Sequence, residues 1–408
     1  MSELEKLLEG VASTGSATEK VEWKMLGEVA IKISSGGTPN TGVSKYYNGD
    51  IPWLRTQEVG SGDIWDTGIK ITESGLKNSS AKMIPENCVI VAMYGATVGK
   101  VGINKIPLCT NQACANIQLN EEVAHYRYVY HFLLSQYEYI KSLGAGSQTN
   151  INAQVVKKLQ IPIPPLSVQK EIVRILDTFT ELAAELAAEL AARRKQYSYY
   201  REQLLSFDEK EVQHLPMGLE SIGKFIRGGG LQKKDFTESG VGCIHYGQIY
   251  TYYGTYTDKT KTFVCEEFAK KARIAKHGDL VIATTSENDE DVCKAVAWLG
   301  NEKIAVSSDA CFYTHSLNPK YVAYFFQTEQ FQKQKRPFIT GTKVRRVNAD
   351  DLAKIKIPVP SSEEQERIVR ILDKFDILTT SMSEGLPKEI ELRKKQYEYY
   401  RDKLLTFK

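Results

Sequence analysis

The sequence lacks the features that mark membrane, secreted or metal-binding proteins. No run approaches the eighteen or so apolar residues of a membrane span, and the first residues, MSELEK, lack the basic-then-apolar order of a signal peptide. We therefore expect a cytoplasmic protein without membrane contact. The seven cysteines form no C-x-x-C pair and have no histidine at zinc-ligand spacing, which predicts buried thiols, no metal site and no cofactor.

An excess of charge of one sign is also missing. The formal net charge is +3 over 408 residues, and the charged and hydrophobic fractions, 25% and 42%, are those of an ordinary globular protein. A net charge this small does not by itself indicate a polyanionic partner, so such a partner has to be inferred from where the basic residues lie. The length allows two or three domains.

What the sequence does contain is one segment used twice. QKEIVRILD at residues 169–177 returns as QERIVRILD at residues 365–373, identical at seven of nine positions. RRKQYSYYR at 193–201 likewise returns as RKKQYEYYR at 393–401, and each copy continues to a Leu-Leu-x-Phe motif. Self-similarity on this scale predicts that one supersecondary unit occurs twice in a pseudo-symmetric frame.

Each copy follows an Ile-Pro-x-Pro motif, which cannot be helical throughout and predicts a helix start directly after it. Ser167 supplies N-cap chemistry in the first copy, and Ser362 with Gln365 forms a candidate capping box in the second. Apolar residues then recur at helical spacing in both copies, so both segments are predicted to be amphipathic helices.

The first of these helices could run unbroken from Ser167 to Phe207. This is about 60 Å at 1.5 Å per residue, a length that suits a coiled coil or strut. Three tandem Glu-Leu-Ala-Ala units at residues 181–192 each add about 6 Å and about 40° of rotation, so their number can act as a ruler; a generic alanine-rich helix is the alternative. The second helix should break or kink at Gly385-Leu386-Pro387.

The segments before the two helices echo each other faintly. Residues 89–92 (VIVA) parallel 280–283 (LVIA), and residues 51–55 (IPWLR) sit where 241–245 (VGCIH) sit. The shared positions are mainly apolar or glycine, whereas the polar residues between them differ, which predicts one scaffold with two different reading surfaces. The tyrosine-rich run from Tyr246 to Tyr256 is interpreted as a hairpin with cross-strand pairs rather than as a stacking platform for bases.

This order of variable segment, Ile-Pro-x-Pro, long helix ending in Lys-Gln-Tyr-x-Tyr-Tyr-Arg, second variable segment and second helix resembles the specificity subunit of type I restriction-modification enzymes, from about Trp23 to the end. Residues 48–56 (NGDIPWLRT) and 278–286 (GDLVIATTS) are similar to family signatures. The tandem units have alanine where the family has threonine, a change that should not alter helix length.

The resemblance implies a mixed α/β (α+β) fold with two globular target-recognition domains, separated by two long antiparallel coiled-coil helices in a pseudo-twofold arrangement. It implies double-stranded DNA, two methyltransferase subunits and motor-nuclease subunits as partners. The expected domains are an N-terminal helix and linker (1–22), target-recognition domain 1 (23–160), repeated helix 1 (161–207), target-recognition domain 2 (208–356) and repeated helix 2 (357–408).

Three segments that resemble enzyme motifs do not hold up, so no catalytic residue is predicted. Residues 94–101 (YGATVGKV) are one residue short of a phosphate-binding loop and end in valine. Asn318-Pro319-Lys320-Tyr321 resembles an adenine-methyltransferase motif but has lysine for its second proline. The acidic residues 287–291 fit a solvated loop better than a nuclease site. A self-sufficient DNA methyltransferase or nuclease, and a coiled-coil assembly protein, remain the alternatives.

The candidate DNA contacts come from charge density and from side chains that can read bases. Residues 333–346 hold six basic residues and no acidic one, which predicts a phosphate footprint: Lys333, Lys335, Arg336, Lys343, Arg345 and Arg346. Candidate base readers in the first domain are Arg55, Thr56, Gln57, Tyr94, Gln148 and Asn150. Those in the second are Arg227, Lys233, Lys234, Tyr246, Gln248, Thr285 and Ser286. The residues expected to face the methyltransferases are Tyr199, Arg201, Tyr399 and Arg401.

Overall fold

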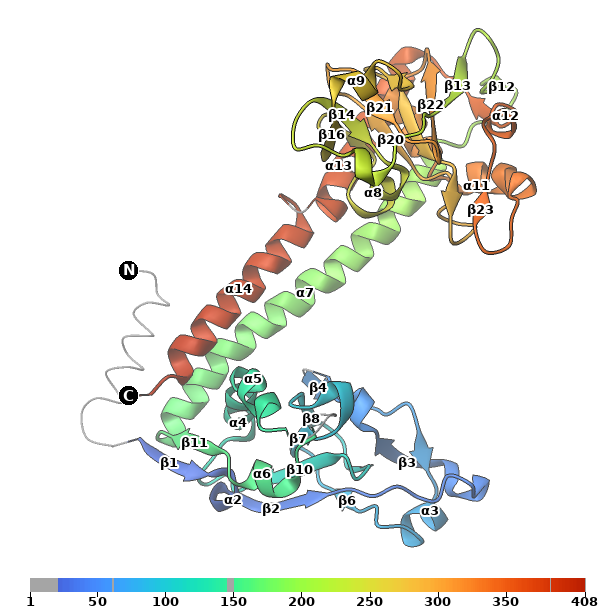
Figure 1. The fold of residues 1–408 in the computed structure, drawn as a ribbon. Coiled ribbons are helices and arrows are strands. Elements are labelled where there is room, and N and C mark those ends of the chain that lie inside the picture. The colour runs from blue at the N-terminus through green and yellow to red at the C-terminus, as the bar shows by residue number, and fades with distance from the viewer. Residues whose placement is uncertain (1–20, 61, 145–149, 382, 408) are drawn as a thin grey trace. The chain divides into compact units, whose positions relative to one another are not determined.

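The computed structural model describes residues 21–60, 62–144, 150–381 and 383–407. The chain forms two compact units, Met1–Glu185 with Glu391–Lys408 and Leu186–Ile390. Each unit therefore combines one globular domain with parts of both repeated helices (Figure 1). The N-terminal helix predicted within residues 1–22 lies outside the described residues, and Glu22 already belongs to a strand.

The first unit contains three sheets and a set of short helices. The five-stranded sheet has the order β2 (Ala30–Ser35), β10 (Cys114–Leu119), β7 (Val89–Ala92), β8 (Val101–Asn104) and β4 (Gly62–Ile64). The four-stranded sheet has the order β5 (Lys70–Ile71), β3 (Tyr47–Leu54), β9 (Leu108–Thr110) and β6 (Met83–Ile84), and the third sheet pairs β1 (Glu22–Met25) with β11 (Gln160–Ile163). Its helices are α2 (Leu26–Val29), α3 (Glu73–Lys77), α4 (Tyr126–Ser135), α5 (Tyr137–Ser142) and α6 (Ala153–Lys157).

The second unit repeats this plan. Its five-stranded sheet has the order β13 (Gly223–Arg227), β22 (Ala310–His315), β18 (Leu280–Ala283), β20 (Ala295–Trp298) and β15 (Tyr256–Thr257). Its four-stranded sheet has the order β16 (Thr262–Val264), β14 (Val241–Ile244), β21 (Ile304–Val306) and β17 (Ile274–Ala275). Two small sheets pair β12 (His214–Pro216) with β24 (Lys356–Pro358) and β19 (Thr285–Ser286) with β23 (Arg345–Arg346). Its short helices are α8 (Tyr246–Thr251), α9 (Glu266–Ala269), α10 (Pro319–Phe325), α11 (Glu329–Lys335) and α12 (Ala349–Leu352).

The two domains share one scaffold, as the weak sequence echo predicts. The echoing runs 89–92 and 280–283 form β7 and β18, each at the centre of its five-stranded sheet and buried at all four positions. Two glycines mark the same close approach in both domains. A Cβ atom on Gly36 would lie 1.9 Å from the Thr110 carbonyl oxygen, and one on Gly228 would lie 2.0 Å from that of Ser307. Only glycine fits at either position.

The tyrosine-rich segment is not the hairpin that the sequence analysis expects. Tyr246–Thr251 forms helix α8, in which the backbone N–H of Gly247 donates to the His245 ring and the Gln248 side chain accepts from the His245 N–H. Tyr246, Tyr250 and Tyr253 recur at helical spacing and pack on one core cluster. Ile249 completes this helical spacing, whereas only Tyr250 and Tyr252 alternate as the strand interpretation requires.

The repeated segments form long helices. Leu166–Leu204 is one helix of 39 residues, α7, which confirms the predicted unbroken helix, although it ends before the predicted Phe207. Because it begins before Ser167, that residue is not its N-cap. The second copy forms α13 (Ser362–Thr380) and α14 (Leu386–Leu405), so the break predicted at residues 385–387 is confirmed. Gly385 has a φ of +85°, and a Cβ atom there would lie 2.4 Å from the Ile377 carbonyl oxygen.

The capping box predicted for the second copy is wrong. Ser361 rather than Ser362 is the N-cap of α13, and its hydroxyl accepts from the Glu364 N–H at 3.3 Å. The Gln365 side chain does not cap the helix but binds two backbone groups outside it. Its side-chain oxygen accepts from the backbone N–H of Asn318 at 2.9 Å, and its side-chain nitrogen donates to the Pro360 carbonyl at 2.9 Å.

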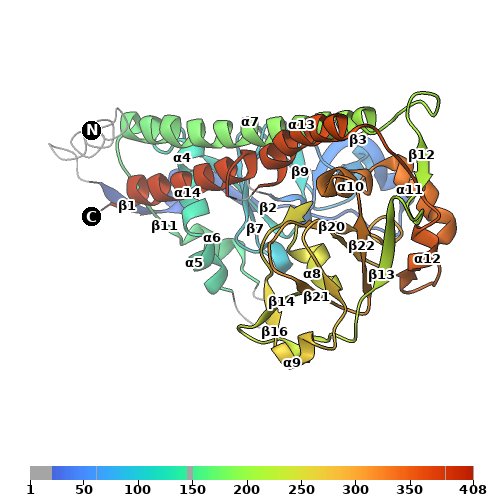
Figure 2. The same ribbon diagram turned by 90° about the horizontal axis from the view of Figure 1, so that it is seen from above.

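The same aromatic contact joins the repeated helices in both units. In the first unit the phenylalanine comes from the first copy and the tyrosine from the second, and in the second unit the roles of the two copies are reversed. In the first unit the ring of Phe179 stacks on Tyr400, with centroids 5.3 Å apart. In the second unit Phe375, which holds the position of Phe179 in the repeat, stacks on Tyr200 at 5.5 Å. The further pairs of Arg194 with Thr379 and Tyr197 with Asp376 show that α7 and α13 run antiparallel within the second unit (Figure 2).

A repeated aspartate ties each domain to its helix. In the first unit the carboxylate of Asp177 accepts from Arg127 Nε at 2.6 Å and lies 2.8 Å from His131 Nε2, while His131 Nδ1 lies 3.0 Å from the Tyr397 hydroxyl. The equivalent carboxylate in the second unit belongs to Asp373. It accepts from Lys320 Nζ and from the Tyr324 hydroxyl, each at 2.7 Å.

The repeated glutamines add a second tie of the same kind. Gln169 accepts from the His125 N–H at 2.8 Å and donates to the Pro164 carbonyl at 2.8 Å, as Gln365 does with Asn318 and Pro360. Both glutamines are buried, and the oxygen and the nitrogen of each side-chain amide are hydrogen-bonded. The repeated glutamine and aspartate are therefore identical positions that anchor a domain.

The aspartate cluster of the first unit contains a buried histidine that responds to acid. Burial lowers the pKa of His131, and its hydrogen bond to Asp177 only partly offsets that effect. Burial alone would raise the pKa of Asp177, but its hydrogen bonds with His131 and Arg127 outweigh burial and hold the pKa below its ordinary value. Because the folded state binds fewer protons at His131 than the unfolded chain, stability falls as the pH drops below about 6.5.

We predict that His131→Gln reduces the loss of stability between pH 7 and pH 5. Glutamine keeps a polar partner for Asp177 but does not titrate, so it removes a slope of at most about 1.4 kcal/mol per pH unit. The measurement is the free energy of unfolding of the first domain at a series of pH values. Tyr324→Phe, at the equivalent position, is the control and should leave the slope unchanged; an unchanged slope in His131→Gln would contradict the assignment.

Candidate DNA interface

The predicted phosphate footprint divides into two groups on the second domain. Lys333 lies exposed on α11, and Arg336 follows it in a short 3-10 turn (Arg336–Phe338), exposed and 3.3 Å from Glu329. Lys343, Arg345 and Arg346 lie instead on a hairpin that closes between Thr340 and Arg346, whose backbone groups exchange two hydrogen bonds of 2.9 Å.

Lys335 is not available to DNA. It is fully buried, and its ammonium group donates to the backbone carbonyls of Asp289 and Val292 at 2.8 Å and of Glu290 at 3.1 Å. Burial lowers its pKa, while Cys293 and Asp289 act in the opposite direction. We therefore leave Lys335 out of the proposed interface and assign it a structural role, holding the acidic loop at residues 287–292. Charge density along the sequence could not distinguish it from its exposed neighbours.

The hairpin that carries the remaining charges is well defined. Gly341 has a φ of +87°, and strand β23 pairs antiparallel with β19, placing Arg345 opposite Ser286 and Arg346 opposite Thr285. Thr285 itself is buried, and its carbonyl accepts from the Tyr250 hydroxyl at 2.7 Å.

Three of the predicted residues from distant parts of the sequence line one pocket. Arg227, Thr285 and Arg346 surround a space of about 190 Å³ together with Asp309 and Asn348. Arg227 ends strand β13 and Arg346 ends β23, so the pocket forms where the five-stranded sheet meets the hairpin. Two guanidinium groups and several short polar side chains around a small pocket suit a phosphate or a base edge.

The other predicted residues of the second domain lie outside this pocket. Lys233 and Lys234 are exposed on a 3-10 turn (Lys233–Asp235). The backbone N–H of Tyr246 donates to the Ser307 hydroxyl at 2.9 Å, while its ring is half-buried. The amide of Gln248 is used at both ends, accepting from His245 and donating to Thr262, so it supports α8.

In the first domain the predicted residues gather around two turns. Arg55 Nε lies 2.8 Å from Glu58 Oε1, Gln57 is exposed, and Thr56 is buried with its hydroxyl 3.4 Å from that of Thr97. Tyr94 is 39% exposed just before the 3-10 turn Gly95–Thr97, and Asn150 accepts from the Gly95 N–H at 3.1 Å. Gln148 lies outside the described residues.

The two sets occupy the same place on the shared scaffold. The Ile151 N–H donates to the Met93 carbonyl at 3.0 Å, and the Val347 N–H donates to the Thr284 carbonyl at 3.1 Å. In the first domain the bond joins the residue after strand β7 to the segment before helix α6, and in the second it joins the residue after β18 to the segment before α12. Tyr94 and Asn150 in one domain therefore correspond to Thr285 and Arg346 in the other, so that the same backbone presents different side chains.

The segments that resemble enzyme motifs have structural roles. Residues 95–97 form a single 3-10 turn between two strands rather than the start of a helix. Asn318 caps α10, its side-chain oxygen accepting from the N–H groups of Lys320 and Tyr321. Within the described parts of the chain, no group of three His, Cys, Asp or Glu side chains could hold a metal ion, and no helix is long and apolar enough to cross a membrane.

The four residues expected to face partner subunits separate into two kinds. Tyr199 and Tyr399 are each 61% exposed. The guanidinium groups of the two arginines are engaged: Arg201 donates to Gln327 at 3.1 Å and lies over the Tyr197 ring, and Arg401 pairs with Asp402 at 2.8 Å.

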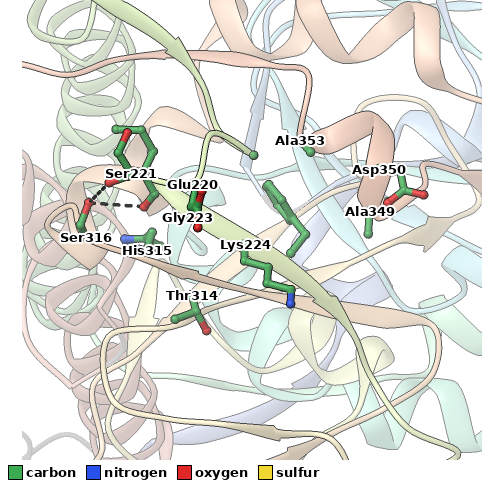
Figure 3. A pocket seen from close by; sticks show the side chains of 13 residues that line it. Glu220, Ser221, Gly223, Lys224, Thr314, His315, Ser316, Ala349, Asp350 and Ala353 are labelled. Carbon is green, nitrogen blue, oxygen red and sulfur yellow. Dashed lines mark hydrogen bonds between the residues drawn. The ribbon is translucent and has the colours of Figure 1, made fainter.

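A groove that the sequence analysis did not foresee lies beside strand β13. It has a volume of about 680 Å³ and contains none of the predicted site residues (Figure 3). Lys224, Asp350 and His315 line it, and the Ser316 hydroxyl donates to the carbonyls of Ser221 and Ile222 at 3.3 Å. Burial lowers the pKa of His315 to about 4, so this imidazole is neutral at pH 7.

A family model described as "Type I restriction modification DNA specificity domain" matches the chain twice, over residues 18–192 and 216–392. The chain belongs to the type I restriction-modification DNA specificity family. Each match covers one domain with the start of the repeated helix that follows it, so the family unit corresponds to the repeat seen in the sequence.

Curated relatives agree with this assignment, and solved structures share the fold. The chain is 33% identical to the putative type I restriction enzyme specificity subunit S.HindORF215P of Haemophilus influenzae, over 99% of this chain and 98% of that protein. It is 37% identical to the EcoR124I/EcoR124II specificity subunit of Escherichia coli, over 62% of this chain and 63% of that one. A chain from a structure of a type I restriction-modification system has the same fold, with 18% identity and a TM-score of 0.63; the match covers 95% of this chain and 98% of that one. The S subunit from M. genitalium also has this fold, with 17% identity and a TM-score of 0.54, and that match covers 96% of this chain and 98% of the S subunit.

Reasoning from sequence missed the carboxylates that accompany two of the predicted arginines. Glu58 lies three residues from Arg55, a spacing that could have indicated the pair. Asp289 lies 2.8 Å from Arg345 Nε, but the two residues are far apart in the sequence and only the fold brings them together.

We predict that Lys335→Met destabilises the second domain by at least about 2 kcal/mol, because three carbonyls, of which that of Val292 is buried, lose a charged donor. Lys333→Met, on the same helix but exposed, is the matched control and should change stability by less than about 0.5 kcal/mol. Urea unfolding of both variants tests this. Equal stability of the two would show that Lys335 does not hold the loop.

Proposed function

We propose that this chain is a non-catalytic specificity subunit whose two domains each read one half of a bipartite site on double-stranded DNA. The observation that supports this most directly is that the same two helix residues bind the neighbouring domain in both units. Asp177 and Gln169 bind the first domain, and Asp373 and Gln365 bind the second. A molecule with two equivalently mounted domains suits a target with two halves.

The domains differ where a reading surface is expected. The scaffold positions are apolar or glycine in both, whereas Tyr94 and Asn150 correspond to Thr285 and Arg346. Direct readout depends on the donors and acceptors that side chains present to base edges, so unlike side chains on like backbones predict unlike half-sites. Lys333, Arg336, Lys343 and Arg346 supply positive charge for the phosphates, and Arg227, Lys233 and Lys234 remain candidate base readers.

Two methyltransferase subunits would dock on the repeated helices, and motor-nuclease subunits would join them to complete the restricting enzyme. The exposed rings of Tyr199 and Tyr399 hold the same position in the two copies, as expected for two identical partners. Catalysis then belongs to those partners. We assign domains 23–160 and 208–356 to DNA reading, and segments 161–207 and 357–408 to the frame.

The direct test is a binding selection from random duplexes with the chain reconstituted with its methyltransferase subunits. We expect two short fixed sequences separated by a spacer of constant length. Selection of a single uninterrupted motif would contradict the proposal. Stoichiometric S-adenosylmethionine binding by the chain alone would favour a self-sufficient methyltransferase, and an absence of any selected motif would favour a purely structural helical protein.

We predict that deleting one Glu-Leu-Ala-Ala unit, residues 185–188, shortens the preferred spacer by at most about two base pairs. One unit removes about 6 Å of helix, and a base pair spans about 3.4 Å along the duplex. Both half-sites should stay the same. Ala187→Lys, an exposed substitution of equal length, is the control and should leave the spacer unchanged; an altered half-site in the deletion variant would count against the ruler.

We further predict that Lys343→Ala weakens binding to all duplexes alike. A lysine on an exposed hairpin contacts phosphate, so its loss should lower the slope of log K against log salt concentration by about one. Titrations at several salt concentrations measure this slope. A change confined to one DNA sequence would instead assign Lys343 to base reading.

A further inference from the structure

Hydrogen bonds fix the conformation of the acidic loop at residues 287–292 of the second domain. Asn288 and Asp291 exchange two hydrogen bonds, from the Asn288 amide to the Asp291 carboxylate at 2.8 Å and from the Asp291 N–H to the Asn288 side chain at 2.7 Å. Lys335 holds the backbone of the same loop from inside through three carbonyls. The position of the loop therefore does not depend on the side chain of Asp289.

Asp289 uses this position to hold Arg345. Its carboxylate lies 2.8 Å from Arg345 Nε, and the carbonyl of Gly341 accepts from Arg345 Nη1 at 2.6 Å. The backbone of Arg345 is fixed as well, because it pairs with Ser286 between β23 and β19. The guanidinium group is thus held from two sides while its side chain stays 34% exposed.

This arrangement is unsuited to a simple phosphate contact. A carboxylate beside the guanidinium offsets part of its charge and repels a phosphate, whereas the exposed Lys343 of the same hairpin has neither drawback. A guanidinium has five N–H donors in a fixed fork, and these two contacts leave the remainder for another acceptor. Guanine presents two adjacent acceptors, O6 and N7, that match such a fork in the major groove.

The first domain contains the same kind of pair. Arg55 Nε lies 2.8 Å from Glu58 Oε1, and the other oxygen of Glu58 accepts from the Gly68 N–H at 2.7 Å, so this carboxylate is also fixed by the backbone. Arg55 follows strand β3, whereas Arg345 belongs to the hairpin strand β23. The pairs hold different places on the shared scaffold, as domains that read different sequences require.

We propose that Asp289 is a positioning residue that orients Arg345 to read a guanine in the half-site of the second domain, and that Glu58 does the same for Arg55 in the first. This inference rests on the proposed function, since it names how each half-site is read. A carboxylate that fixes the guanidinium group in advance increases discrimination between bases. A base other than guanine must either leave the free N–H donors of the guanidinium unpaired or disturb its contacts with the protein.

The test is a selection from random duplexes with the complex reconstituted with its methyltransferase subunits, using Asp289→Asn, Arg345→Ala and Lys343→Ala. In Arg345→Ala we expect the preference for guanine at one position of one half-site to fall by about 10-fold to 100-fold. Asp289→Asn should relax the same position by a smaller factor and leave the other half-site intact. Lys343→Ala should lower affinity uniformly and keep every preference.

Several outcomes would overturn the inference. Tighter binding of Asp289→Asn to all duplexes with unchanged preference would show that Asp289 competes with phosphate for Arg345. Uniform weakening in Arg345→Ala would make Arg345 a phosphate contact. Because Lys335 holds the loop, Asp289→Asn should unfold at the wild-type temperature, and Arg345→Ala probes the same pair from the other side.

The first domain supplies an independent arm of the experiment. Glu58→Gln and Arg55→Ala should relax one guanine position in the opposite half-site and leave the half-site of the second domain unchanged. If the wild-type complex selects no split motif, the proposed function itself fails. If it selects one and all four variants keep its guanines, only the reading by carboxylate-held arginines is wrong.

Discussion

A partly buried carboxylate on each repeated helix, Asp177 or Asp373, governs how the two domains are held. Asp177 and Asp373 are largely removed from water, where a lone charge is costly, so each needs partners from the domain beside it. Arg127 and His131 supply them in the first unit, and Lys320 and Tyr324 in the second. The partners differ in chemistry but come from equivalent helices, α4 and α10, which fixes how each domain meets its helix.

This constraint separates what the chain must keep from what it can vary. The anchoring glutamines and aspartates, the stacked Phe and Tyr rings and the glycines at close approaches recur in both halves. The turns next to the central strands differ freely, because the scaffold bonds there use backbone groups, as between Ile151 and Met93 or Val347 and Thr284. A family member can therefore change its reading surface without disturbing the frame.

The frame could be predicted from the sequence because its signals are local or repeated. Long apolar periodicity, the duplicated motif and Gly385 predicted α7, the second copy and its break, and the weak similarity of the two variable segments predicted a common scaffold. Short elements were harder to predict: Tyr250 and Tyr252 alternate as in a strand although α8 forms there, and Ser361 competes with Ser362 as a cap. The site was harder still, since the burial of Lys335 and the pairing of Asp289 with Arg345 depend on contacts between segments that are distant in the sequence.

If the same contact holds both domains on their helices, the two domains should be interchangeable as DNA readers. The most direct measurement replaces residues 208–356 with a second copy of residues 23–160 and determines the DNA sequence selected by the reconstituted complex. The account predicts that Arg127 and His131 of the inserted copy will pair with Asp373, and that the complex will select two copies of the first half-site in opposite orientations. Selection of the original two half-sites, or of a single half-site in a folded complex, would contradict it.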